Sequence, residues 1–111
     1  MALVTFVHVG DAIDYTPAAD VAAGAVVVQG ELVGVAKLSI SANKLGALAV
    51  KGVFDFPKAT GVGTAIAAGA NCYWNAGAQQ ATTTATGNKL IGKCFRTAVD
   101  ADTTVRIRML Q

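Results

Sequence analysis

The chain has 111 residues, 53% of them hydrophobic and 14% charged, with a formal net charge of +2. This length fits one domain, residues 1–111, around one core. The nine Lys and Arg residues are spread along the chain, which argues against nucleic-acid binding. Gly, Gln and Thr interrupt the longest uncharged stretch, residues 59–88, so no segment offers the roughly 20 apolar residues of a membrane-spanning helix.

The first 16 residues are expected to form an extended arm, with a strand at residues 3–9. No basic residue precedes the apolar start, so we predict no secretory signal and synthesis in a cytoplasm. Asp11, Asp14 and Asp20 do not have the spacing of a calcium loop, and turn or cap roles are commoner for Asp. His8 has no second His or Cys at metal-ligand spacing, so no metal site is predicted.

Short runs rich in Val, Ile and Thr, separated by Gly, Asn or Asp, predict a mainly β fold, either a small β-barrel or a β-sandwich. A tight two-residue turn is expected at Gly30 and Glu31. Helix is limited to about one turn at residues 64–68. The expected strands are residues 3–9, 25–29, 32–38, 47–54, 71–74, 79–84, 90–98 and 103–110.

An internal repeat divides this domain into two related β-units, residues 21–54 and 66–110. Residues 21–25, VAAGA, recur as residues 66–70, IAAGA, and a strand follows each copy at once. Related second and third strands then follow in both copies. The second copy is longer between its first two strands, and its additional residues, around 75–87, are predicted to extend a long hairpin with a turn near Gly77.

Residues 26–28, VVV, predict a strand that is apolar on both faces. Such a strand either lies in the core or is covered by another subunit, and self-association as a homo-oligomer is therefore a hypothesis at this point. Arg106 and Arg108 alternate on the last strand and share one face, which is expected to be solvated.

The motifs that resemble catalytic sites lack the context that their chemistry needs. Residues 87–93 match a phosphate-binding loop, but Cys94 replaces the magnesium-binding hydroxyl and the following residues predict a strand instead of a helix. Cys72 and Cys94 are expected to be buried free thiols. Of the adjacent rings Tyr73 and Trp74, one should pack in the core and the other lie at a surface. We therefore predict no enzyme, no catalytic residue and no cofactor.

Five segments of the chain share their order with a known family: residues 10–16, 23–27, 32–36, 52–59 and 82–92. Together they resemble a family of small tailed-phage and prophage proteins, the capsid cement or head decoration proteins. The resemblance implies a β-rich protein, often a trimer, that binds the major capsid protein on the outer surface of a phage head and stabilises the mature capsid. It also implies localisation in the virion after synthesis in the host bacterial cytoplasm.

Contacts with the partner are predicted at Phe6, His8 and Tyr15 in the arm and at Trp74. Two alternatives stay open at this point. One is another virion component, such as a head fibre base or a tail-associated module. The other is a module that binds a small ligand or a carbohydrate, with Trp74 on the rim of its site.

Overall fold

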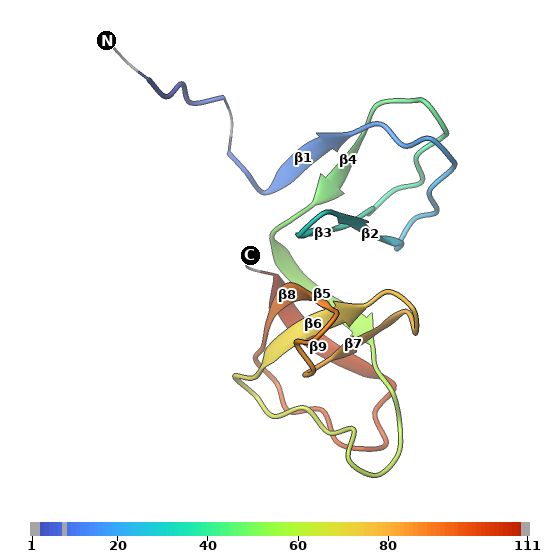
Figure 1. The fold of residues 1–111 in the computed structure, drawn as a ribbon, viewed down its shortest axis with the longest axis vertical. Coiled ribbons are helices and arrows are strands. Elements are labelled where there is room, and N and C mark those ends of the chain that lie inside the picture. The colour runs from blue at the N-terminus through green and yellow to red at the C-terminus, as the bar shows by residue number, and fades with distance from the viewer. Residues whose placement is uncertain (1–2, 8, 110–111) are drawn as a thin grey trace.

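The computed structural model describes residues 3–7 and 9–109, and it places nine strands in two antiparallel sheets (Figure 1). The first sheet has the order β1-β4-β3-β2 and the second the order β5-β9-β8-β6-β7. The predicted mainly β class is confirmed, whereas the choice between barrel and sandwich stays a prediction. The strands are β1 (Ala12–Tyr15), β2 (Val26–Gln29), β3 (Leu32–Val35), β4 (Gly46–Ala49), β5 (Gly52–Pro57), β6 (Asn71–Asn75), β7 (Gln80–Thr82), β8 (Lys89–Cys94) and β9 (Thr104–Met109).

Three of the expected elements differ from the structure. Among described residues 3–7 and 9 there is no strand, while β1 lies inside the predicted arm and pairs with β4. The single strand expected at 47–54 is divided into β4 and β5, because Gly52 has φ of 130°, where L side chains are rarely found, and the chain passes there from one sheet to the other. Instead of a helical turn at 64–68, the hydrogen bonds Thr64 N to Gly61 O and Ala70 N to Ala67 O form two tight turns.

The predicted two-residue turn at Gly30 and Glu31 is present, whereas the hairpin predicted to be long at residues 75–87 is short, with β7 only three residues in length. Gln29 pairs with Leu32 across a two-residue turn, and Gly30 adopts the positive φ of 62° that such turns favour. In the second sheet, Asn75 pairs with Gln80 across a four-residue turn. The β6–β7 hairpin adds an edge strand that has no counterpart in the first sheet.

The two sheets otherwise share one strand plan, in which β1, β2, β3 and β4 correspond to β5, β6, β8 and β9. One row of residues that pair across neighbouring strands illustrates the match. In the first sheet it runs through Val26, Val35, Ala49 and Ala12, and in the second through Asn71, Lys93, Arg108 and Val53.

The loop hydrogen bonds repeat as well. Val21 and Ile40 exchange two backbone hydrogen bonds, as Ile66 and Ala98 do. The N–H of Ala23 donates to Ser39 Oγ, and the N–H of Ala68 donates to Thr97 Oγ1. These equivalences begin at β1 in one sheet and at β5 in the other, earlier than residues 21 and 66. The division into repeat units at residues 21–54 and 66–110 stays a prediction.

Each unit packs the same seven positions into a core. The strand pairing and loop hydrogen bonds align the first set with the second, residue by residue. The first set is Ile13, Tyr15, Val21, Val27, Ala36, Ile40 and Leu48. The second set is Phe54, Phe56, Ile66, Cys72, Cys94, Ala98 and Ile107.

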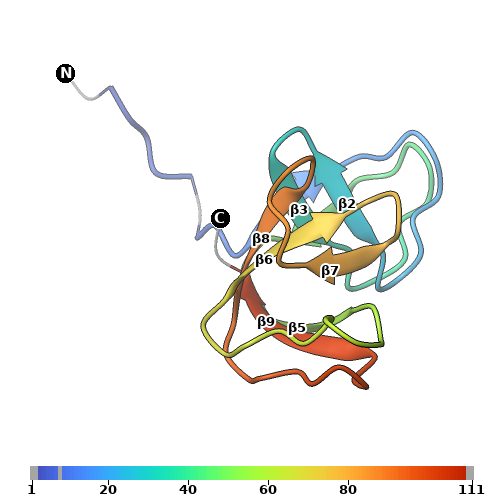
Figure 2. The ribbon, with the colours of Figure 1, turned by 60° about the horizontal axis from the view of Figure 1, so that its bottom comes forward.

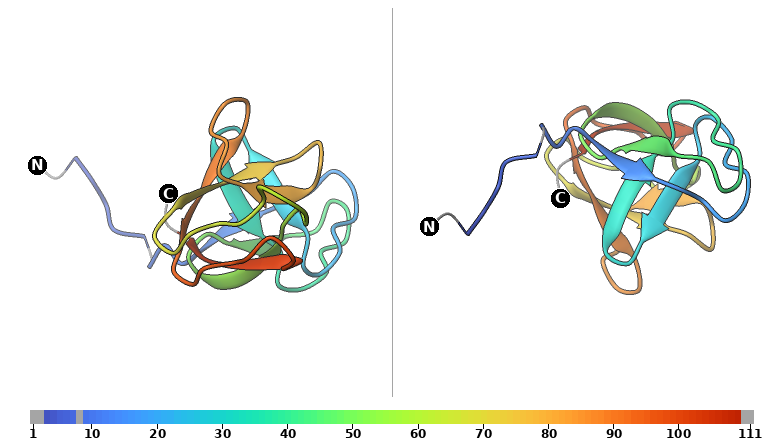
Figure 3. Two further views of the ribbon diagram at one scale, coloured as in Figure 1. Left: turned by 90° about the horizontal axis from the view of Figure 1, so that it is seen from below. Right: turned by 90° about the horizontal axis from the view of Figure 1, so that it is seen from above.

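The units are joined where β3 lies against β8 (Figure 2). Val33 and Val35 point away from the first core and belong to the buried cluster of the second unit. An ion pair at 2.8 Å between Lys89 Nζ and Glu31 Oε1 also bridges the units. The right panel of Figure 3 views the molecule from above, so that the first sheet, with β1 in blue, faces the reader.

Gly46 on β4 allows Ile40 to cover the first core. A Cβ at this position would lie 2.7 Å from three side-chain atoms of Ile40, which is only 6% exposed and therefore has little space to move. Overpacking of this kind costs about 1–3 kcal/mol. We therefore expect Gly46→Ala to lower the free energy of unfolding by about that amount in chemical denaturation.

Gly10→Ala is the matched control, because a Cβ at Gly10 would meet nothing within 4 Å and its φ is not positive. This control should leave the stability unchanged or raise it slightly. Equal stability of the two variants would show that Ile40 does not pack against β4 in this way.

Candidate functional site

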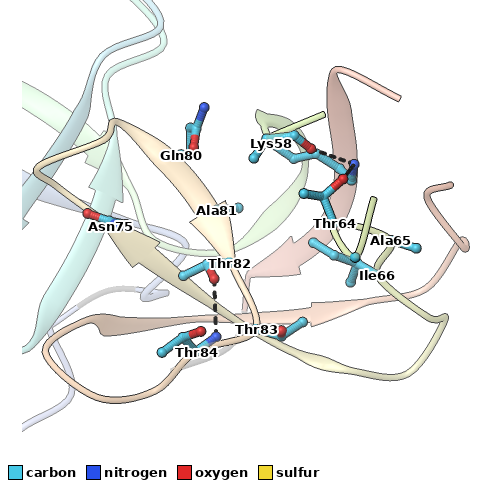
Figure 4. A pocket seen from close by; sticks show the side chains of 12 residues that line it. Lys58, Thr64, Ala65, Ile66, Asn75, Gln80, Ala81, Thr82, Thr83 and Thr84 are labelled. Atoms are coloured by element: carbon cyan, nitrogen blue, oxygen red, sulfur yellow. Dashed lines mark hydrogen bonds between the residues drawn. The ribbon is translucent and has the colours of Figure 1, made fainter. Parts of the chain in front are cut away.

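A polar hollow of about 200 Å³ lies beside Lys58, between β7 and the loop that follows β5 (Figure 4). Lys58 is only 4% exposed, and its ammonium donates to Ala59 O at 2.7 Å, Asp102 O at 3.0 Å and Thr64 Oγ1 at 3.4 Å. An ammonium has three N–H groups, so these acceptors use all of them. Lys58 thus ties two loops together and has no donor left for a ligand.

Cys72 and Cys94 are buried free thiols, as the sequence predicts. They occupy the positions of Val27 and Ala36 in the first unit, and therefore act as small core residues. Burial, with a smaller contribution from Cys94, raises the pKa of the Cys72 thiol to about 11. A thiol with a raised pKa that lies out of solvent is a poor nucleophile.

Because of this raised pKa, the stability of the protein varies with pH in the alkaline range. The folded state disfavours the Cys72 thiolate, so its contribution is complete below the ordinary value of 9.0 and is lost as the pH rises towards 11. Chemical denaturation should show the free energy of unfolding falling across this range.

Cys72→Val provides the control, because Val27 fills the equivalent position. Its stability at neutral pH should lie within about 1.5 kcal/mol of the natural protein. Across the same alkaline range its loss of stability should be smaller, since the buried thiol is gone. An identical pH dependence in both proteins would contradict the burial of this thiol.

An apolar hollow of about 320 Å³ lies on the first unit, between the end of β3 and the start of β4. Leu38 and Leu45 line it and are 78% and 72% exposed. The corresponding place in the second unit is lined by Arg96, Thr104 and Arg106 instead. The same scaffold therefore presents an apolar surface on one unit and a charged surface on the other.

The arm before β1 is the second exposed apolar feature. Leu3, Val4, Phe6 and Val7 are between 79% and 92% exposed, and the segment projects from the body in Figure 1. Water is an unfavourable environment for such a group of side chains, and exposed apolar patches commonly mark contact sites.

Two of the four predicted contacts are available at the surface. Phe6 is 81% exposed, and Tyr15 is half-buried on β1, where it packs against the first core. His8 lies outside the described residues. Trp74 is only 3% exposed and packs edge-on to Phe56 at 6.1 Å, so it is a core residue and we withdraw it as a contact.

Arg106 and Arg108 are predicted by sequence to share a solvated face. Arg106 makes two hydrogen bonds to the Asp55 carboxylate, at 2.9 and 3.1 Å, and the pKa of Asp55 is lowered by them. Arg108 lies opposite Lys93 on the neighbouring strand. Alternation along β9 is enough to predict that the two arginines share one face. The position of Lys93 beside Arg108 follows only from the pairing of β8 with β9, which the sequence does not predict.

Within residues 3–7 and 9–109, no group of three or more His, Cys, Asp or Glu residues is arranged to hold a metal ion. No helix in the same part of the chain is long and apolar enough to cross a membrane. The exposed features are instead an apolar arm, an apolar hollow and a charged sheet face. Surfaces of this kind are suited to contact with another macromolecule.

Comparison with known families agrees with this arrangement. The model of a family described as phage cement protein matches residues 7–109. The chain belongs to this family. The match covers both sheets and thus nearly the whole chain, and it associates this cement protein with the phage capsid in a structural role. No curated protein and no solved structure matches the chain.

Proposed function

We propose that this cement protein binds the outer surface of a phage head and stabilises the mature capsid, with the major capsid protein as its partner. The observation that carries the proposal is the family match over residues 7–109. The exposed apolar arm and the hollow at Leu38 and Leu45 support it, because they offer contact area that the chain itself does not cover. Assembly as a trimer on the virion is part of the same proposal.

The mechanism is preferential binding. If the protein binds the mature shell better than the precursor or broken shell, its binding free energy stabilises the mature state by mass action. Each site adds about 2.7 kcal/mol when the free protein is at 100 times its Kd. Since a shell offers many equivalent sites, modest affinity at each one produces a strongly reinforced head.

The arm is the element that we assign to strand pairing. Residues 3–7 carry four apolar side chains and no charge, a composition that favours addition to an exposed strand edge of the coat protein or of a neighbouring subunit. Strand addition satisfies the backbone groups of the arm, while its side chains enter apolar hollows. The described structure leaves the side chains of residues 3–7 exposed, ready for such a contact.

The direct test mixes the purified protein with undecorated, expanded heads. We expect the protein to sediment with the heads and to increase their resistance to heat and to chelators. Purified tails serve as the control, because a tail-associated module would bind them instead. Failure to bind any expanded head would contradict the proposal.

Truncation of residues 2–7 tests the arm and leaves β1 intact. We expect at least a tenfold loss of affinity for heads, because burial of one large apolar side chain contributes about 1.5–3 kcal/mol. Phe6→Ser should reproduce part of this loss. Val62→Ser is the matched control, since Val62 is fully exposed in a loop of the second unit. Unchanged head binding by the truncated but folded protein would remove the arm from the mechanism.

A further inference from the structure

One face of the second sheet is both open and basic. It consists of exposed or half-exposed side chains on β5 and β9, and on β8 with the residue that follows it; we call it the β9 face. Phe95 directly follows the end of β8 and, like Lys93, is exposed. The β9 face comprises Val53, Asp55, Lys93, Phe95, Arg106 and Arg108.

The charges on this face are not balanced. Lys93 and Arg108 are register partners on adjacent strands, so two cations lie directly opposite each other. Within residues 3–7 and 9–109 neither makes an ion pair, and the single carboxylate of the face, Asp55, is already held by Arg106. Like charges in this arrangement destabilise a sheet.

The first unit shows that the scaffold does not need charge at these positions. Val35 and Ala49 occupy the places of Lys93 and Arg108, and Ala47 occupies that of Arg106. Val35 is buried because this face of the first sheet packs on the second unit. The place of the buried Val35 is therefore taken by an exposed lysine in the second unit.

Apolar side chains accompany the cations. Val53 is 54% and Phe95 53% exposed. Arg beside an aromatic residue is typical of protein interfaces. A nucleic-acid surface would instead gather many basic residues without a carboxylate among them. The mixture of Arg, Phe, Val and Asp thus favours a protein partner.

We propose that the β9 face docks on an acidic protein surface of the phage head. This inference rests on the proposed function, and it adds the chemistry of the contact and the side of the protein that makes it. Acidic groups of the partner would neutralise Lys93 and Arg108 together, and relief of their repulsion contributes to binding. Val53 and Phe95 would supply apolar area beside these charges.

Lys93→Glu tests the proposal, with binding to undecorated heads as the measurement. The substitution places an opposite charge beside Arg108, so thermal stability should stay the same or rise. Affinity for heads should nevertheless fall at least about tenfold, because the new carboxylate faces an acidic partner. Binding by the natural protein should also weaken as salt is added, and binding by the variant should respond less.

Lys44→Glu is the matched control, because it changes the net charge equally and is exposed on the first unit. Its head binding should equal that of the natural protein. Equal affinities of the Lys93→Glu and Lys44→Glu variants would overturn the inference while leaving head binding established. A third result would show that the β9 face binds nucleic acid instead. In that case DNA would retain the natural protein but not the Lys93→Glu variant, while both would bind heads equally. No head binding by the natural protein would remove the proposed function and this inference together.

Discussion

The packing of Val33 and Val35 into the second unit is the contact on which the arrangement of the molecule depends. The first unit fully buries only three residues in its own core, Ala36, Ile40 and Leu48. A four-stranded sheet with so small a core gains little stability alone. By adding side chains from its opposite face to the larger core of the second unit, it becomes part of one body. This contact fixes the arm, the apolar hollow and the β9 face relative to one another.

The two units share one strand plan but carry different side chains on their surfaces. Seven equivalent positions fill the two cores, and loop hydrogen bonds recur at matching places, so these features specify the fold. Residues that point away from the cores are free to differ. Val35, Ala47 and Ala49 of the first unit, for example, are replaced by Lys93, Arg106 and Arg108 in the second. One strand plan thus presents different exposed surfaces on its two units, within a chain of 111 residues.

Local patterns in the sequence predict much of the fold but little of the surface. Alternation and turn residues indicate most strands, and the repeat of VAAGA by IAAGA anticipates two units with matching loops. β1 is missed because AIDY is short and its pairing with β4 is set by residues far along the chain. Trp74 and Lys93 could not be placed either. Burial of the ring depends on Phe56, and the repulsion at Lys93 depends on its register with Arg108.

We propose that this cement protein acts by attaching to the outside of the phage head. Electron cryomicroscopy of expanded heads mixed with the purified protein is the decisive measurement, because the map shows both the position and the orientation of the protein. We expect additional density on the outer surface, with residues 3–7 and the β9 face against the shell. Heads without outer density at saturating protein, or with density only at the tail, would contradict it.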